Sequence, residues 1–237
     1  MKAIILAGGR GERLRPFSDT MPKSVVPVEK YPFLWYVLRY LKTQDIHKIV
    51  MLTGYQADKI KETLGAGGQM NLSIEYQAES EPLGTGGALL RARNQIDEDV
   101  LVLNGDTYCE LNVSDFYAFH RKNQADFTIA VVKAASNKTD FGLIAMNSKN
   151  QVLQFREKQR GSGYSSAGFY IVSPRLFSRF SFPHSPCSLE KDLIPSWLGQ
   201  SVQIYGFPIS ENKFFDIGTP EHFNEFRNFI KGRSQCV

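Results

Sequence analysis

The chain has 237 residues, 42% hydrophobic and 22% charged, a balance typical of a folded protein rather than a disordered one. Its net charge of +4 is spread along the chain without a basic stripe, so we expect no nucleic-acid partner. The three cysteines are widely separated and the opening apolar run is too short for a secretory signal. We therefore expect a cytoplasmic protein without a disulfide framework, a zinc site or a membrane span.

The first 135 residues alternate between apolar strands and amphipathic helices. The pattern predicts strands at residues 3–7, 49–52, 72–76, 100–103 and 127–132. It predicts helices that open at Pro32-Phe33 and that span residues 57–64, 88–94 and 115–122. Continuous apolar strands separated by helices are typical of a sheet that is covered on both sides. The expected fold is therefore α/β, with a Rossmann-like, mostly parallel sheet and helices on both faces.

After residue 135 the alternation loosens, and the expected portion is smaller and antiparallel. Strands are predicted at residues 142–146, 152–155 and 168–172, and a helix at 189–198 with Ser188 as its cap. Thr219-Pro220-Glu221 predicts the start of the last helix, which runs to about Lys231. We expect a single domain over residues 1–237, with parts at 1–135, 136–215 and 216–237.

The loop after the first strand has the composition of a phosphate-binding loop. It reads Gly8-Gly9-Arg10-Gly11-Glu12-Arg13, and Pro22-Lys23 follows. Glycines let backbone N–H groups approach an anion, and the cations neutralise it. The loop is not a Walker A loop, because no Gly-Lys-Ser/Thr follows at the required spacing. It is not a dinucleotide-binding fingerprint either, because Leu14 stands where the third glycine is needed. Because an ordinary turn also uses glycines, the prediction depends on Arg13 and Lys23.

Four sequence blocks occur in a fixed order. They are Leu6-Ala7-Gly8-Gly9-Arg10-Gly11-Glu12-Arg13-Leu14-Arg15-Pro16, Pro22-Lys23-Ser24-Val25-Val26-Pro27-Val28, Leu103-Asn104-Gly105-Asp106 and Asp216-Ile217-Gly218-Thr219-Pro220. Together they resemble the sugar-1-phosphate nucleotidyltransferases, also called sugar-nucleotide pyrophosphorylases. The resemblance covers nearly the whole chain. It implies the nucleotide-diphospho-sugar transferase fold, with a nucleoside triphosphate and a sugar 1-phosphate as substrates.

Asp106 and Asp216 are the predicted metal ligands. Each follows an apolar segment, where parallel sheets place their ligands. Mg²⁺ takes a few carboxylate oxygens from a protein and the rest from phosphates and water. Either aspartate alone would be a common helix cap or turn residue. Inside the family blocks, the two together predict that Mg²⁺ is the cofactor.

The resemblance also implies the residues that contact the nucleotide. Arg13 and Lys23 are expected on the triphosphate, since a guanidinium grips two oxygens and an ammonium adds a movable charge. With Asp106 they are the predicted catalytic residues. The predicted nucleotide-binding residues are Leu6, Ala7, Gly8, Gly9, Gly11, Arg13, Lys23, Glu79, Gly84, Thr85 and Asn104.

Glu79 carries the prediction of the nucleobase. In the family, the block that matches Glu79 to Ala88 meets the base and the ribose, with Gly84 close to the base. Guanine presents two adjacent donors, N1–H and N2–H₂, which one carboxylate accepts together, whereas uracil and thymine offer a single imide N–H. Glu79 therefore favours GTP, and the alternative is that Glu79 and Glu81 form a solvated pair on a loop.

The acceptor contacts are implied by the resemblance alone. In the family, the lysine of a Glu-Lys pair binds the phosphate of the sugar 1-phosphate, and the glutamate meets sugar hydroxyls. Glu157-Lys158 matches that pair, and Gly142 and Gly168 match further acceptor contacts. Many members have asparagine where this chain has Ser166, which weakens any inference about the sugar.

The expected reaction joins GMP from GTP to a sugar 1-phosphate and gives a GDP-sugar and pyrophosphate. The short length and the Glu-Pro-Leu-Gly-Thr block favour D-glycero-α-D-manno-heptose 1-phosphate as acceptor. The alternatives are mannose 1-phosphate, the same reaction with UTP, dTTP or CTP, and a non-catalytic regulatory subunit that binds a nucleotide sugar. Residues 1–135 would bind the nucleotide, 136–215 the sugar phosphate, and 216–237 would add a metal ligand and a helix. The 12% aromatic content is compatible with a homo-oligomer.

Overall fold

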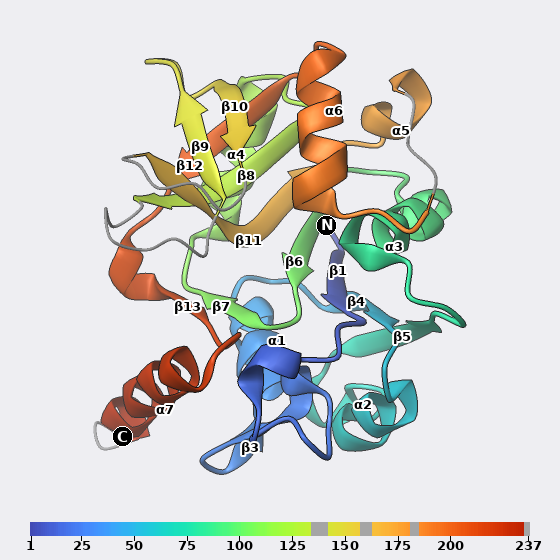
Figure 1. Ribbon diagram of the computed structural model, residues 1–237, viewed down its shortest axis with the longest axis vertical. Helices are drawn as coiled ribbons and strands as arrows, with labels where there is room; N and C mark the ends of the chain where they lie inside the picture. Colours follow the sequence, from blue (N-terminus) through green and yellow to red (C-terminus); the bar gives the residue numbers. More distant parts are fainter. Residues whose placement is uncertain (134–141, 157–162, 181–184, 235–237) are drawn as a thin grey trace. The chain divides into compact units, whose positions relative to one another are not determined.

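The computed structural model describes residues 1–133, 142–156, 163–180 and 185–234 (Figure 1). These residues belong to two compact units. The N-terminal unit comprises residues 2–81, 104–110 and 214–237, and the central unit comprises residue 1, 82–103 and 111–213. The single domain over 1–237 and its division at residues 135 and 215 stay predictions.

A parallel sheet lies at the centre of the N-terminal unit (Figure 1, blue to teal). Strand β1 (Ala3–Ala7) pairs with β4 (Lys48–Thr53), and β4 pairs with β5 (Ser73–Ala78). Every residue of β1 is buried, as are all residues of β4 except Lys48, because strands covered on both faces need apolar side chains on each side. The parallel strands predicted for this part of the chain are confirmed.

Two helices connect these strands along the chain. Helix α1 (Phe33–Thr43) precedes β4, and α2 (Ala57–Leu64) lies between β4 and β5. The apolar residues of α1 recur at helical spacing and form one buried face: Leu34, Val37, Leu38 and Leu41. Both helices were predicted from that periodicity, and both are present.

Short strands that the sequence pattern did not predict complete this unit. Strand β7 (Thr107–Cys109) pairs antiparallel with β13 (Phe214–Asp216), and β2 (Pro27–Val28) pairs with β3 (Tyr31–Pro32). Two or three residues are too few to show a period of two, so periodicity could not reveal them. Helix α7 (Pro220–Ser234) starts as predicted, with the amide of Phe223 donating to the carbonyl of Thr219 at 2.9 Å.

The central unit is built on a largely antiparallel sheet. Its longest strand, β11 (Tyr164–Val172), pairs antiparallel with the strands on its two sides and with a third at its start. These partners are β6 (Val100–Asn104), β8 (Phe127–Lys133) and β9 (Leu143–Met146). Further strands are β10 (Val152–Arg156), antiparallel to β9, and β12 (Ile204–Pro208), parallel to β8. The antiparallel additions to the sheet were therefore predicted correctly in kind.

Two helices of the central unit show the largest departures from the predicted bounds or type. Helix α3 (Gly84–Arg91) begins four residues earlier than expected, because the carbonyl of Cys187 accepts the amides of Gly86 and Gly87. The expected helix at 189–198 is a π-helical turn, η5 (Leu189–Leu193), that continues into α6 (Ile194–Gly199). Pro195 in the first turn of α6 has no N–H to donate, which breaks the regular α pattern.

The described residues of this unit also form α4 (Val113–Lys122) and α5 (Arg175–Arg179), of which α5 was not predicted from the sequence. Asn112 caps α4, because its side-chain oxygen accepts the amide of Asp115 at 3.1 Å. Across the described ranges, none of the helices has both the length and the apolar character needed to cross a membrane.

Each unit contains one of the two tryptophans of the chain. In the N-terminal unit, Trp35 is half-buried, and its ring stacks on Tyr31 with 3.7 Å between centroids. The guanidinium of Arg39 lies 5.3 Å from the centre of the Trp35 ring. In the central unit, Trp197 is fully buried and packs 5.2 Å from the ring of Phe127. The two indoles therefore have very different exposure to water.

A buried histidine in the central unit gives a prediction of pH-dependent stability. The His120 side chain is 1% exposed, and its Nδ1 lies 2.7 Å from the hydroxyl of Thr128. Burial lowers the pKa of His120 from 6.5 to about 4, although the carboxylate of Asp99, 3.8 Å from Nε2, opposes that shift. The folded protein therefore binds fewer protons than the unfolded chain between these two values. The contribution of neutral His120 to the free energy of unfolding is fully present above about pH 6.5, and it is lost as the pH drops toward 4.

We expect His120→Gln to remove most of this dependence. Wild type should lose up to about 3 kcal/mol more free energy of unfolding than the variant between pH 7 and pH 4. Urea unfolding followed at several pH values measures the difference. Parallel pH profiles for the two proteins would contradict the assignment. The exposed His47 provides the control, because His47→Gln should keep the slope of the wild type.

Candidate active site

The glycine-rich loop of the N-terminal unit is shaped by the groups packed against it. Gly11 has a φ of +71°, and a Cβ at that position would lie 2.8 Å from the Cβ of Lys23. Only glycine fits both the backbone conformation and the space. A Cβ at Gly8 would lie 3.4 Å from Oε1 of Glu79. The loop thus brings Lys23 and Glu79, which are far apart in the sequence, to its two sides.

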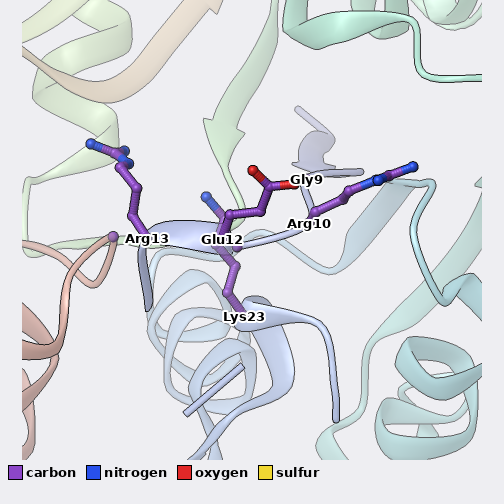
Figure 2. Close-up of a pocket in the computed structure, with 7 residues that line it drawn as sticks. Gly9, Arg10, Glu12, Arg13 and Lys23 are labelled. Carbon is purple, nitrogen blue, oxygen red and sulfur yellow. The ribbon is translucent and has the colours of Figure 1, made fainter. Parts of the chain in front are cut away.

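A hollow of about 300 Å³ opens on this loop. It is lined by Gly9, Arg10, Gly11, Glu12, Arg13, Lys23 and Gly218. Figure 2 shows Arg10 and Arg13 leaving the loop in opposite directions, while Lys23 extends toward it from a separate turn. Three cations against the single carboxylate of Glu12 make the hollow electropositive. Backbone amides and cations around one concavity are suited to bind phosphate groups.

Lys23 forms an ion pair with Asp106. The ammonium of Lys23 donates to Oδ2 of the carboxylate, and the two side chains are 21% and 14% exposed. Burial raises the pKa of Asp106, but the ammonium of Lys23 outweighs it and holds that pKa below its ordinary value. The carboxylate is therefore charged at neutral pH, and it is partly neutralised by a movable cation.

Asp216 lies beside Asp106 because β7 and β13 pair. Asp216 is opposite Thr107 in that ladder, and the amide of Ile217 donates to the carbonyl of Asp106 at 3.0 Å. Burial and the negative charge of Asp106 raise the pKa of Asp216 to about 6, although its Oδ1 accepts the amide of Gly218 at 2.6 Å. Two carboxylates that disfavour each other's charge form a natural site for a divalent cation.

The donor set of this pair is small and consists of oxygen. Among the residues that the structure describes, no group of three or more histidines, cysteines, aspartates or glutamates could hold a metal ion. A cation at Asp106 and Asp216 would therefore take further ligands from water or from a bound substrate. This is the way Mg²⁺ is bound next to phosphates. The carboxylate chemistry fits Mg²⁺ better than it fits a structural zinc ion.

The other predicted residues of the N-terminal unit gather at the same loop. The amide of Gly105 donates to the carbonyl of Leu6 at 2.9 Å, which joins the 104–106 turn to the end of β1. Ala7 is buried at that end. The side-chain oxygen of Asn104 is buried without a hydrogen-bond partner among the described residues. The structure therefore brings the first and third sequence blocks together.

The predicted residues of the central unit are placed less completely. Gly84 and Thr85 open α3, Gly142 lies just before β9, and Gly168 lies in β11 with a φ of +67°. A Cβ at Gly142 would lie 2.9 Å from the ring of Phe155, so that glycine is required by packing. Glu157 and Lys158 lie outside the described residues.

Sequence reasoning missed four residues that line the hollow or support a predicted contact. Arg10, Glu12 and Gly218 line the hollow, although all three stand inside the family blocks. Glu190 accepts a hydrogen bond from the predicted nucleotide contact Thr85 at 3.1 Å. No sequence signal linked those two positions, since they are 105 residues apart.

Comparison with known proteins points in one direction. The family model described as nucleotidyl transferase matches residues 2–233. A D-glycero-alpha-D-manno-heptose 1-phosphate guanylyltransferase of Aneurinibacillus thermoaerophilus is 35% identical over 227 residues, which are 95% of this chain and 96% of that protein. A mannose-1-phosphate guanylyltransferase of Mycobacterium tuberculosis is 30% identical, in an alignment that covers 99% of this chain and 64% of that protein.

The fold is also found among solved structures. HddC from Yersinia pseudotuberculosis, in a crystal structure complexed with GMP-PN, has a TM-score of 0.82 and is 30% identical. The match covers 97% of this chain and 99% of that one. The likeness confirms the predicted α/β fold with a mixed, mostly parallel central sheet.

Proposed function

This chain belongs to the nucleotidyl transferase family and is a sugar-1-phosphate nucleotidyltransferase, and we propose that it is a guanylyltransferase. In this reaction GMP is joined from GTP to a sugar 1-phosphate, and pyrophosphate is released. One observation supports the proposal most strongly. An electropositive hollow on a glycine loop lies beside two neighbouring carboxylates, Asp106 and Asp216. Such a site holds polyphosphate and a divalent cation together.

Transfer of GMP to the sugar 1-phosphate requires that the substrates are positioned and their charges neutralised, and it does not require a general base. A phosphate oxygen of the sugar 1-phosphate attacks the α-phosphorus of GTP in line, and the bond from that phosphorus to the bridging oxygen of pyrophosphate breaks. The attacking oxygen is already an anion, so no proton has to be removed. Arg13 would grip two phosphate oxygens at once. Lys23 would exchange the carboxylate of Asp106 for the phosphates as the transition-state charge develops.

Asp106 and Asp216 are the residues that would hold Mg²⁺. Their hard oxygen donors fit a divalent cation, and so does the raised pKa of Asp216, which burial and the negative charge of Asp106 cause together. When bound, the ion supplies neutralisation of the phosphate oxygens during transfer. The chain's own cations supply the rest of that neutralisation. Lys158 is proposed to hold the acceptor phosphate, on the strength of the family pattern.

GTP is the proposed donor, because Glu79 lies against the glycine loop where a carboxylate can accept both donors of guanine. The guanylyltransferase names of the relatives and the GMP-PN bound by HddC support the same base. The heptose 1-phosphate is the proposed acceptor, because the relative named for it matches along 96% of its own length. Mannose 1-phosphate is the second candidate, supported by the other relative. A cytoplasmic location and a homo-oligomer stay predictions.

Release of pyrophosphate from a panel of substrates tests the function. We expect GTP to react at least about tenfold faster than UTP, dTTP or CTP with the preferred acceptor, and excess chelator to stop the reaction. The acceptors to compare are heptose 1-phosphate and mannose 1-phosphate. A regulatory subunit would bind the nucleotide sugar and release nothing. That outcome would refute the proposal.

Glu79→Gln tests the base within the same assay. The amide presents a donor to the N1–H or N2–H₂ of guanine, so kcat/KM for GTP should fall about 10- to 100-fold while the rate with UTP changes little. The exposed neighbour Glu81 provides the matched control, because Glu81→Gln removes the same charge from the same loop. If both variants lost activity equally, the base contact would be wrong.

A further inference from the structure

Glu190 lies at the centre of a hydrogen-bond network in the central unit. Both oxygens of its carboxylate are occupied. The hydroxyl of Tyr170 donates to Oε1 at 2.9 Å, and the hydroxyls of Thr85 and Ser188 donate to Oε2 at 3.1 and 3.2 Å. The residue sits on the π-helical turn η5, an unusual conformation that often occurs at functional sites. None of the roles assigned so far uses this carboxylate.

On one side, the network shapes residues 84–87, which include the predicted nucleotide contacts Gly84 and Thr85. The amide of Leu189 donates to the hydroxyl of Thr85 at 2.8 Å. The carbonyl of Cys187 accepts the amides of Gly86 and Gly87 at 2.9 and 3.2 Å. Gly84 has a φ of +72°, and a Cβ there would lie 2.4 Å from the same carbonyl. The block therefore follows the contour of residues 187–190.

On the other side, the network reaches the acceptor bulge, defined here as residues 166–170 of β11. The ladder with β8 shifts its register between Ser166 and Tyr170, and Gly168 lies between them with a φ of +67°. The hydroxyl of Ser166 accepts the amide of Gly168 at 3.1 Å and donates to the hydroxyl of Tyr170 at 3.1 Å. Tyr170 is fully buried, so its hydroxyl needs hydrogen-bond partners inside the fold.

We propose that Glu190 is a positioning residue for nucleotidyl transfer, which fixes the nucleotide block through Thr85 and the acceptor bulge through Tyr170. The inference rests on the proposed function, since that function makes both segments substrate contacts. An ionised carboxylate only accepts hydrogen bonds, and here three hydroxyls already supply donors. Glu190 thus acts through its neighbours. It holds the two segments in the geometry that aligns an attacking oxygen with a phosphorus.

Three variants separate the two arms of the network. Tyr170→Phe removes the hydrogen bond between Tyr170 and Glu190, the acceptor arm of the network. It should raise the KM for sugar 1-phosphate about tenfold and keep the KM for GTP within about twofold of the wild type. Thr85→Val removes the hydrogen bond between Thr85 and Glu190, the nucleotide arm, and should raise the KM for GTP while the KM for sugar 1-phosphate changes little. Glu190→Gln should raise both KM values. Adding Tyr170→Phe to Glu190→Gln should raise the acceptor KM no further, because the arm is already broken.

The control is Asp192→Asn on the same turn. The Oδ2 of Asp192 accepts the amide of Ser188 at 2.7 Å, a bond that the oxygen of asparagine can still make, so this change removes one charge and leaves the network intact. Both KM values should stay within about twofold of the wild type. Melting temperatures are recorded for every variant. A role in folding alone would lower kcat and the melting temperature together and leave both KM values unchanged, which would overturn the proposal.

Two further measurements keep the test decisive. If Glu190→Gln does not fold, Tyr170→Phe and Thr85→Val still test the inference. Opposite effects of these two variants on the two KM values support it, and equal effects refute it. If the wild type releases no pyrophosphate with any substrate pair, the proposed function fails. The affinity for GTP by calorimetry then tests the nucleotide arm alone. Thr85→Val and Glu190→Gln should weaken it about tenfold, while Tyr170→Phe should not.

Discussion

Asp106→Asn is expected to lower kcat by about 10²–10³-fold or more, while the affinity for GTP changes less than about tenfold. The carboxamide keeps the size of the side chain but loses the charge that is paired with Lys23 and set beside Asp216. Most nucleotide contacts predicted from the sequence are independent of that charge. Steady-state rates of pyrophosphate release, with calorimetric binding of GTP, measure the two effects separately.

The same variant should also change the titration of its neighbour. Since the negative charge of Asp106 helps to raise the pKa of Asp216 to about 6, its removal should shift that pKa downward. Asp58→Asn in the first turn of α2 removes an exposed carboxylate from the same unit and should leave turnover unchanged. Normal turnover in Asp106→Asn would refute the role assigned to this residue.

Lys23→Met has the second largest expected effect, because it removes a cation that both binds substrate and neutralises Asp106. We expect kcat/KM to fall about 10²–10³-fold. Breaking a fully buried pair costs about 3–5 kcal/mol; because 14% and 21% of these side chains stay exposed, we expect a loss of about 1–3 kcal/mol at pH 8. Urea unfolding measures the loss.

The stability deficit should depend on pH with a definite sign. In the wild type the folded pKa of Asp106 lies below its ordinary value of 3.8, so the pair stabilises the fold above that pH and its contribution is lost in stronger acid. In the variant, burial raises the pKa of Asp106 without the opposing ammonium of Lys23, and the carboxylate becomes neutral as the pH falls. The deficit should therefore shrink below about pH 5. Lys61→Met, an exposed lysine on α2, should show no deficit at either pH.

The sequence was most informative where a structure is formed by residues that are adjacent in the chain. The strand Ala3–Ala7 and the loop after it are adjacent in the sequence. The apolar run predicted the strand, and the glycines predicted the loop. Asp106 and Asp216 were singled out because each follows an apolar segment inside a family block. Their mutual placement depends on β7 and β13, strands of three residues each, which have no periodic signal.

The sequence was least informative where the structure depends on tertiary contacts. The first turn of α3 contains three glycines, which local propensity excludes from a helix, and it forms because Cys187 accepts its amides. Glu190 belongs to an ordinary polar stretch, and its partners Thr85 and Tyr170 stand 105 and 20 residues away. No local pattern predicts contacts over such separations.

Because the two tryptophans differ in burial, the intrinsic fluorescence of the protein can report on each unit separately. Trp35, half-buried under Tyr31 and Arg39, emits from a partly hydrated setting, whereas Trp197 emits from a dry one. Replacing either indole with phenylalanine leaves a single tryptophan, whose emission wavelength on selective excitation follows one unit only. Denaturation curves of the two single-tryptophan proteins therefore reveal whether the units melt in one cooperative transition or in sequence.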